Sequence, residues 1–130
     1  MNLEPKPATV AGPEQTFTGR VWFDVLCGAH PESAMRVNRV RFAPGARTAW
    51  HAHPGGQTLH VTQGVALMGT RDGTVLVVHP GETVYTPPGE EHWHGATPDD
   101  FMEHLAMWED QPGNGAVWAE HVSDADYARR

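Results

Sequence analysis

Turns built on Pro-Gly and Asp-Gly pairs divide most of this chain into short apolar runs, and this pattern constrains its fold most strongly. The turns are APGA at 43–46, HPGGQ at 53–57, RDG at 71–73, HPGE at 79–82 and PPGEE at 87–91. The runs between them are rich in Val, Phe, Trp and Thr, which favour β-strands. Because no long stretch has a convincing helical period, the pattern predicts an all-β fold.

The predicted strands follow this division. They lie at 17–26, 35–43, 48–53, 57–62, 65–70, 74–79, 83–86, 92–95 and 101–109. Many short strands separated by such turns are typical of a β-sandwich or barrel, and the pattern alone does not separate a double-sheet jelly roll from a closed barrel. One short helix is predicted in SDADYAR near the C-terminus, where Ser123 is the cap and Asp126 follows three residues later.

The predicted domain organisation is simple. Residues 1–16 contain three prolines and no hydrophobic period, so we expect an extended N-terminal arm or an edge element there. Residues 17–130 are expected to form a single domain, as suits a chain of 130 residues.

Composition excludes several classes of function. The net charge is −7, Lys6 is the single lysine and no basic stripe is present, so nucleic acid is not an expected partner. The single cysteine, Cys27, permits no intrachain disulfide and indicates a buried structural thiol. No apolar run approaches the ~18 residues of a membrane span, and the N-terminus has no targeting pattern. A cytoplasmic protein without a membrane partner is therefore predicted.

Two pairs of histidines, each with one residue between them, indicate a metal site. Side chains alternate along a strand, so His51 and His53 in WHAHPGGQ share one face, and the following turn brings Gln57 back alongside them. His92 and His94 in GEEHWHG share a face in the same way. A single pair would more often be two surface or hydrogen-bonded histidines. Two pairs beside Pro-Gly turns favour a shared metal site, because a barrel can place the second strand against the first.

These motifs resemble those of the cupin family. The segment GARTAWHAHPGGQTLHVTQG, which begins at Gly45, resembles the first cupin motif, and GETVYTPPGEEHWHGA, which begins at Gly81, is similar to the second. Two positions depart from the motifs, because Gln57 stands in place of Glu and Ala96 in place of Asn. The resemblance implies a small single-domain cupin, a jelly-roll barrel (double-stranded β-helix) with a divalent metal inside. The metal ligands that it implies are His51, His53, Gln57 and His92.

A closer resemblance extends over most of the chain. The segments PGARTAWHAHPGGQTL, HPGETVYTPPGEEHWHGA and VWAEHVSDADYARR are similar to those of the bacterial cupin-type hydroxynitrile lyases, the manganese-dependent mandelonitrile lyases. The resemblance implies a metal-dependent carbon–carbon lyase that reversibly cleaves a small cyanohydrin into an aldehyde and hydrogen cyanide. It implies manganese as the metal, while mixed nitrogen and oxygen ligation also suits iron, zinc, nickel and cobalt.

The glutamine carries chemical information of its own. A neutral amide beside three neutral imidazoles leaves the charge of a bound metal uncompensated, whereas a carboxylate would lower the net charge of the site by one. Such a site should be a stronger Lewis acid and should disfavour higher oxidation states. Gln57 therefore favours redox-neutral chemistry over a quercetinase-type cupin dioxygenase, which is the first alternative function. The second alternative, a non-enzymatic cupin that binds a small molecule, is less consistent with the additional inward histidines.

Lewis-acid chemistry also needs a group that moves a proton. His94 shares the inward face of His92 and is not required as a ligand, and His104 lies in FMEHLAMW, where the same face is otherwise apolar. We predict that His94 or His104 is the catalytic base. The alternative for His104 is a hydrogen-bonded histidine of the core. The lyase resemblance implies functional histidines at both positions.

The pocket wall is predicted from the same alternation. In RVNRVRF, Arg39 and Arg41 should face solvent, since charged side chains are rarely buried unpaired. The side chains that alternate with them, Asn38, Val40 and Phe42, should then face the barrel. Asn38 would then contact the substrate or, as an alternative, bond a neighbouring backbone group. The predicted substrate contacts are Asn38, Val40, Phe42, Met102 and Trp108.

Alternation also directs other side chains away from the site. Trp50 and Trp93 have the opposite parity to their histidine neighbours, so we expect them to face outwards or to pack into a sheet interface. Outward aromatics and the N-terminal arm predict a homodimer or a higher homo-oligomer. Surface or structural roles are predicted for the remaining histidines, His30, His60, His79 and His121.

Overall fold

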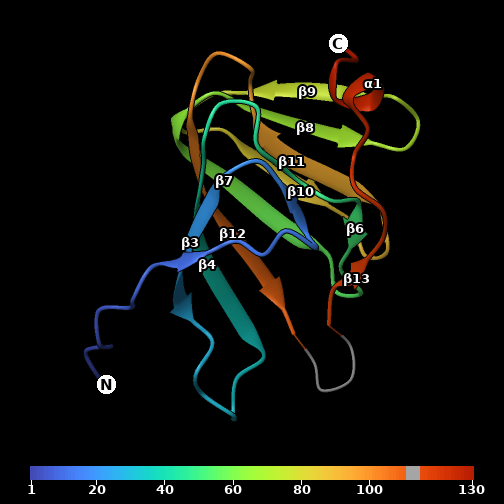
Figure 1. Ribbon diagram of the computed structural model, residues 1–130. Coiled ribbons are helices and arrows are strands. Elements are labelled where there is room, and N and C mark those ends of the chain that lie inside the picture. Colours follow the sequence, from blue (N-terminus) through green and yellow to red (C-terminus); the bar gives the residue numbers. More distant parts are fainter. Residues whose placement is uncertain (111–114) are drawn as a thin grey trace.

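A computed structural model describes residues 1–110 and 115–130 of the chain, and strands dominate this part (Figure 1). The all-β jelly-roll prediction is confirmed. The elements are β1 (Val10–Ala11), β2 (Phe17–Thr18), β3 (Val21–Cys27), β4 (Met35–Phe42), β5 (Arg47–Thr48), β6 (His51–Ala52), β7 (Gln57–Gly64), β8 (Ala66–Thr70), β9 (Val75–Val78), β10 (Thr83–Thr86), β11 (His92–Ala96), β12 (Met102–Glu109), β13 (Val117–Trp118) and α1 (Asp124–Tyr127).

Two curled sheets form the barrel. One has the strand order β1-β3-β4-β12-β7-β10. The other has the order β13-β6-β11-β5-β2, with β8 paired to β11 and β9 paired to β8. All of these pairings are antiparallel, and many join strands that are distant in the sequence. The pairing of β6 with β11 places His92 directly opposite His51, so the two histidine motifs meet across neighbouring strands.

The predicted strand positions agree with the structure to within a few residues, with two kinds of difference. For example, β10 matches the predicted strand 83–86. The predicted strand 17–26, in contrast, is divided into β2 and β3 by Gly19, whose φ of 78° breaks the extended backbone. The predicted strand 48–53 is likewise divided, into β5 and β6. The two-residue strands β1 and β13 were not predicted, because a run so short carries no detectable alternation.

The helix prediction is confirmed in detail. Helix α1 follows Ser123, whose Oγ accepts a hydrogen bond of 3.1 Å from the backbone N–H of Asp126. The N-terminal arm carries β1, which forms the outer edge of one sheet by pairing with β3. No helix in the described residues is long and apolar enough to cross a membrane.

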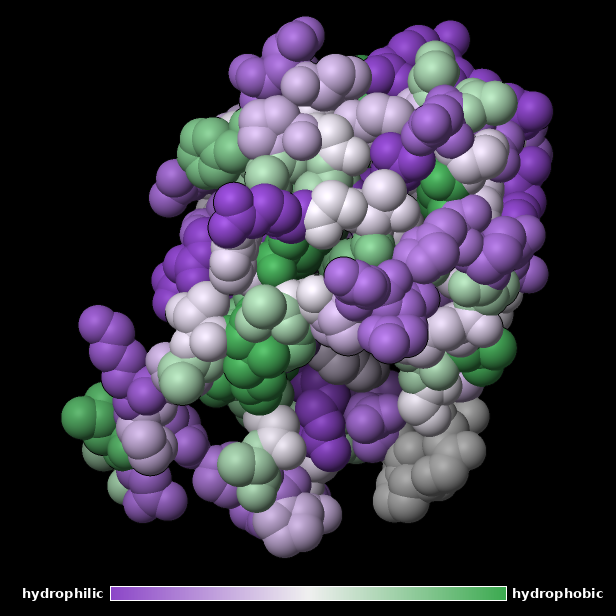
Figure 2. Space-filling view, viewed as in Figure 1, coloured by the Kyte–Doolittle hydropathy of each residue, from purple (hydrophilic) through white to green (hydrophobic). Residues whose placement is uncertain are grey.

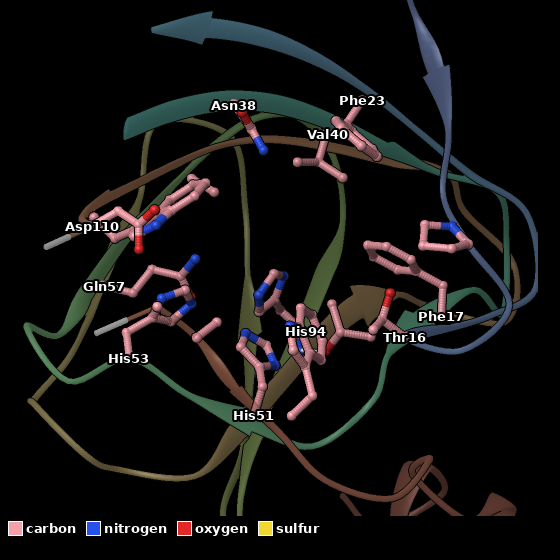
Figure 3. Close-up of a pocket in the computed structure, with 17 residues that line it drawn as sticks. Thr16, Phe17, Phe23, Asn38, Val40, His51, His53, Gln57, His94 and Asp110 are labelled. Atoms are coloured by element: carbon pink, nitrogen blue, oxygen red, sulfur yellow. Dashed lines mark hydrogen bonds between the residues drawn. The ribbon is translucent and has the colours of Figure 1, made fainter. Parts of the chain in front are cut away.

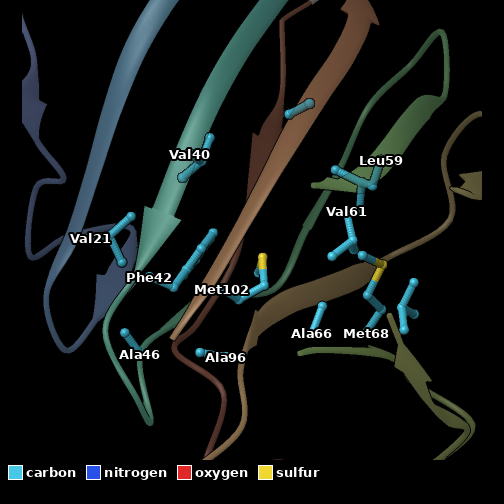
Figure 4. Close-up of a cluster of buried hydrophobic side chains, with 12 residues drawn as sticks. Val21, Val40, Phe42, Ala46, Leu59, Val61, Ala66, Met68, Ala96 and Met102 are labelled. Atoms are coloured by element: carbon cyan, nitrogen blue, oxygen red, sulfur yellow. The ribbon is translucent and has the colours of Figure 1, made fainter. Parts of the chain in front are cut away.

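The main hydrophobic core fills one end of the barrel (Figure 4). Phe42 of β4 and Met102 of β12 are paired across the sheet, and their exposed fractions are 1% and 0%. Leu59 and Val61 of β7 are also fully buried. Each such side chain stabilises the fold by roughly 1.5–3 kcal/mol relative to an exposed one. This end of the barrel is closed, and the opposite end carries the polar groups described below.

A second cluster lies on the outer face of the sheet that contains β11. Trp50 and Trp93 point away from the histidines, as alternation requires, but their exposed fractions are only 3% and 1%. The expectation of an exposed aromatic surface is therefore wrong, and the alternative, that these rings pack into an interface, agrees with their burial. The C-terminal segment covers them, and Tyr127 of α1 fixes it by donating a hydrogen bond of 2.7 Å to the Ala96 carbonyl.

Hydrophilic side chains cover much of the face seen in Figure 2, with hydrophobic ones gathered near its middle. This agrees with the net charge of −7. The homo-oligomer and the cytoplasmic location stay predictions.

Candidate metal centre and active site

The turn after β6 positions the first ligand candidates. Gly56 adopts a φ of 80°, and its N–H donates to the His53 carbonyl over 3.0 Å, which reverses the chain. A side chain at this glycine would also approach the Thr86 carbonyl to 2.9 Å, so the position requires glycine on two grounds. Because the turn is this tight, Gln57 begins β7 close to the two histidines that precede the turn.

Three histidines form a compact buried cluster. His51, His53 and His92 are 1%, 5% and 2% exposed, and each offers a ring nitrogen within 4.8 Å of the others. The Nδ1 atom of His51 donates to the Ala49 carbonyl over 3.0 Å, and Nδ1 of His92 donates to the Glu90 carbonyl over 2.9 Å. These bonds fix the tautomer, so both Nε2 lone pairs are free to bind a cation. The three histidines could therefore hold a metal ion.

The contact between His92 and Gln57 provides a test of this fit. Nε2 of His92 lies 2.9 Å from Oε1 of Gln57, in a buried environment. Because Nδ1 of His92 carries the proton of the neutral ring, both facing atoms are acceptors. Two lone pairs at this distance repel each other unless a cation lies against both or the amide turns over and donates through its NH₂ group. The donor set of three imidazoles and one amide oxygen thus fits a divalent metal.

His94 and His104 form a second, directly bonded pair. Nε2 of His104 lies 2.8 Å from Nδ1 of His94, and the rings are 4% and 0% exposed. The other nitrogens, Nε2 of His94 and Nδ1 of His104, have no hydrogen-bond partner among the described residues. The backbone N–H of His94 donates to Thr48 Oγ1 over 3.2 Å, which secures its strand. One proton is shared along the pair, so His94 Nε2 is a free base when its Nδ1 is the donor.

Burial keeps these imidazoles neutral. Loss of hydration, together with the neighbouring His92, lowers the pKa of His51 to about 3. The same two causes lower the pKa of His53 to about 4, opposed by the Asp110 carboxylate. Burial lowers the pKa of His104 to about 4, and that of His94 lies well below its usual value for the same reason. Neutral rings are the form that binds a metal or accepts a proton.

The metal-free protein is expected to lose stability as the pH falls below about 6.5. The folded-state pKa of His104 is about 4 and the unfolded value is 6.5, so the unfolded chain binds protons more readily in this range. The contribution of His104 is fully present above pH 6.5 and falls by about 3 kcal/mol by pH 4. Denaturant unfolding of metal-free protein across this range should show the decline, and His104→Gln should make it shallower. An unchanged slope in the variant would contradict the buried neutral state.

The cluster opens into a pocket with a cavity volume of about 440 Å³ (Figure 3). His51, His53 and His94 lie on its floor, with Gln57 beside His53. Trp118 stacks on the His51 ring, with centroids 4.5 Å apart, and holds one face of that candidate ligand. The other principal lining residues are Phe17, Phe23, Asn38, Val40, Ala106, Trp108 and Asp110.

The predicted substrate contacts divide into two groups. Asn38, Val40 and Trp108 line the pocket. Phe42 and Met102 do not, because they are paired at the closed end of the barrel and belong to its core, and placing them on the pocket wall was wrong. Between the two predicted bases, His94 lines the pocket and His104 lies behind it. The four histidines that were given other roles lie outside the candidate cluster.

Three further pocket residues were not predicted from the sequence. Asp110 lies one residue past the end of β12 and has the same parity as the inward side chains of that strand. The alternation along β12 could therefore have predicted that Asp110 points into the barrel. Trp118 belongs to the two-residue strand β13, which brings it opposite His51. Phe17 packs edge-on against Phe42 and lies near Trp118, and nothing in the local pattern of β2 indicated either contact.

Comparisons with known proteins agree with this fold and site. The family model described as "Cupin domain" matches residues 38–108. The chain is 47% identical over 122 residues to the (R)-mandelonitrile lyase of Granulicella tundricola, and the match covers 94% of this chain and 93% of that protein.

Solved structures show the same architecture. A cupin-like protein from Thermotoga maritima superposes with a TM-score of 0.87 at 34% identity, covering 98% of this chain and 95% of the other. The polyketide cyclase RemF from Streptomyces resistomycificus superposes with a TM-score of 0.73 at 20% identity, covering 98% and 90%. The second likeness concerns the fold alone.

Proposed function

The chain belongs to the cupin family, and on that premise we propose that it is a metal-dependent hydroxynitrile lyase that reversibly cleaves a cyanohydrin into an aldehyde and hydrogen cyanide. The observation that carries this proposal is the 47% identity to a mandelonitrile lyase along nearly the whole chain. A shared fold would not suffice, because one fold hosts many chemistries. The geometry of the pocket supports the proposal by supplying a residue for each chemical task.

His51, His53, His92 and Gln57 would hold the metal, which we propose is manganese. A divalent metal bound there supplies positive charge that stabilises the negative charge developing on the cyanohydrin oxygen. The neutral amide of Gln57 preserves this charge, which a carboxylate would reduce. The burial of all four side chains lowers the local dielectric constant and so strengthens the interaction.

His94 is the proposed base. Its Nε2 accepts the hydroxyl proton of the cyanohydrin while its Nδ1 donates to Nε2 of His104. As the hydroxyl becomes a carbonyl, the bond to the nitrile carbon breaks and its electron pair leaves with cyanide. The proton on His94 then passes to cyanide, which gives hydrogen cyanide and restores the neutral ring. His104 fixes the tautomer of His94 and stabilises its transient charge.

The proposed activity is tested with purified protein whose metal content has been measured by elemental analysis. Mandelonitrile at acidic pH should release benzaldehyde faster than in buffer alone. Samples reconstituted with manganese, iron, cobalt, nickel or zinc should identify the active metal. No excess release with any of these metals would overturn the proposal.

Gln57→Glu is expected to retain metal binding and to lower the rate of cyanohydrin cleavage. The carboxylate replaces one oxygen ligand by another, but it adds one negative charge and weakens the Lewis acid. We expect a decrease in kcat of at least about tenfold, equivalent to about 1.4 kcal/mol in the barrier. Metal content and kcat are measured on the same sample. A variant that cleaves as fast as the parent would show that the charge argument is wrong.

A further inference from the structure

The pocket has two chemically different sides (Figure 3). Phe17, Phe23 and Val40 form an apolar side. Asn38 and Asp110 lie on the other, with Asn38 directed into the cavity. The proposed lyase chemistry assigns neither Asn38 nor Asp110 a part in bond cleavage or proton transfer.

The sheet register places these two polar residues on the same inner face, four positions apart along the paired strands. Asn38 of β4 lies opposite Ala106 of β12, whose small side chain leaves space in front of the amide. Asp110 lies two residues after Trp108 and so points to the same face. Its backbone N–H donates to the Ala34 carbonyl over 2.8 Å, which continues the pairing of the two strands. Both side chains therefore face inward at the open end of the barrel.

The charges at this side select against ionic groups. The Asp110 carboxylate lies 3.8 Å from Nε of Arg36, and its side chain is 37% exposed. The carboxylate disfavours an anionic substituent, whereas Arg36 disfavours a cationic one. A neutral hydroxyl group suits this environment, because it can donate to the carboxylate or accept from the Asn38 amide.

We propose that Asn38 and Asp110 form a polar subsite that binds a hydroxyl substituent of the substrate, so that the chain prefers a hydroxylated aromatic cyanohydrin to an unsubstituted one. This inference rests on the proposed lyase function for its chemistry, but the binding of the hydroxyl group is measurable without turnover. A cavity of about 440 Å³ is within the range of sites that hold ligands well above ten non-hydrogen atoms.

The test compares substituents of similar size. The metal-containing protein as purified is assayed for cleavage of 3- and 4-hydroxymandelonitrile and of 3- and 4-methylmandelonitrile, with the buffer rates subtracted. Binding of the corresponding benzaldehydes is measured by calorimetry. We expect at least one hydroxylated isomer to exceed its methyl counterpart about tenfold in kcat/KM and in affinity, as befits a hydrogen bond to a charged acceptor.

Substitutions assign the preference to the two residues. For the isomer that shows the preference, either Asp110→Asn or Asn38→Leu should reduce the hydroxyl-to-methyl ratio to near one. Glu109→Gln is the matched control, because it removes the same charge from the exposed neighbour on the outer face and should leave the ratio unchanged. A ratio near one in the parent, or a preference that survives both substitutions, would overturn the subsite. Cleavage without a hydroxyl preference would contradict the subsite but not the lyase function. Preferential binding of the hydroxylated aldehyde without cleavage would support the subsite and contradict the lyase function.

Discussion

Replacement of His92 by alanine is expected to remove the bound metal and to reduce cyanohydrin cleavage to the rate in buffer. His92 lies opposite His51 across the β6–β11 pairing and contacts Gln57, so its loss removes the ligand that joins both halves of the site. The two remaining imidazoles and the amide should bind a divalent cation more weakly, because one of the three imidazole ligands is lost. Elemental analysis after dialysis and the mandelonitrile assay measure the two effects.

His60→Ala provides the matched control. His60 lies on β7 with the opposite parity to Gln57, and its Nδ1 contacts Thr83 Oγ1 at 2.8 Å on the outer side. Its loss should change neither metal content nor rate. If His92→Ala kept a full complement of metal after dialysis, the histidine cluster would not be the metal site.

Replacement of His94 by glutamine is expected to retain the metal and to lower kcat by about 10²- to 10⁴-fold, the usual contribution of a positioned general base. His94 lines the pocket, whereas the metal candidates are complete without it. KM should change much less than kcat, because the lost interaction belongs to proton transfer. Steady-state kinetics on a sample of known metal content separates these effects.

His104→Gln distinguishes the two members of the pair. His104 does not line the pocket and acts only through Nδ1 of His94, so its loss should lower kcat less than the loss of His94. A larger effect for His104 than for His94 would reverse the proposed roles. An unchanged kcat in His94→Gln would exclude it as the base.

Local rules predicted much of the site because they depend on backbone alternation alone. His51 and His53 share a face by the geometry of an extended strand, and Gly56 reverses the chain directly afterwards. The histidine cluster and the helix cap at Ser123 were therefore predictable. Parity also placed Asn38 and Val40 correctly inside the barrel.

Parity says whether a side chain points inward, but it does not say how far along the barrel axis that side chain lies. The register of β4 against β12 decides this depth. It pairs Phe42 with Met102 at the closed end and Asn38 with Ala106 near the open end. Alternation also does not say whether an outward side chain is exposed. Trp50 points outward, but a segment more than 60 residues away in the sequence covers it.

The sequence by itself determined which side chains turn inward and which of them are chemically suited to bind a metal. Only the tertiary structure decided which inward residues reach the pocket. It placed His94 in front of His104, moved Phe42 and Met102 into the core, and brought Asp110 and Trp118 to the pocket wall. The physical reason is that alternation is a property of one strand, whereas depth in a barrel depends on its register with strands far away in the chain.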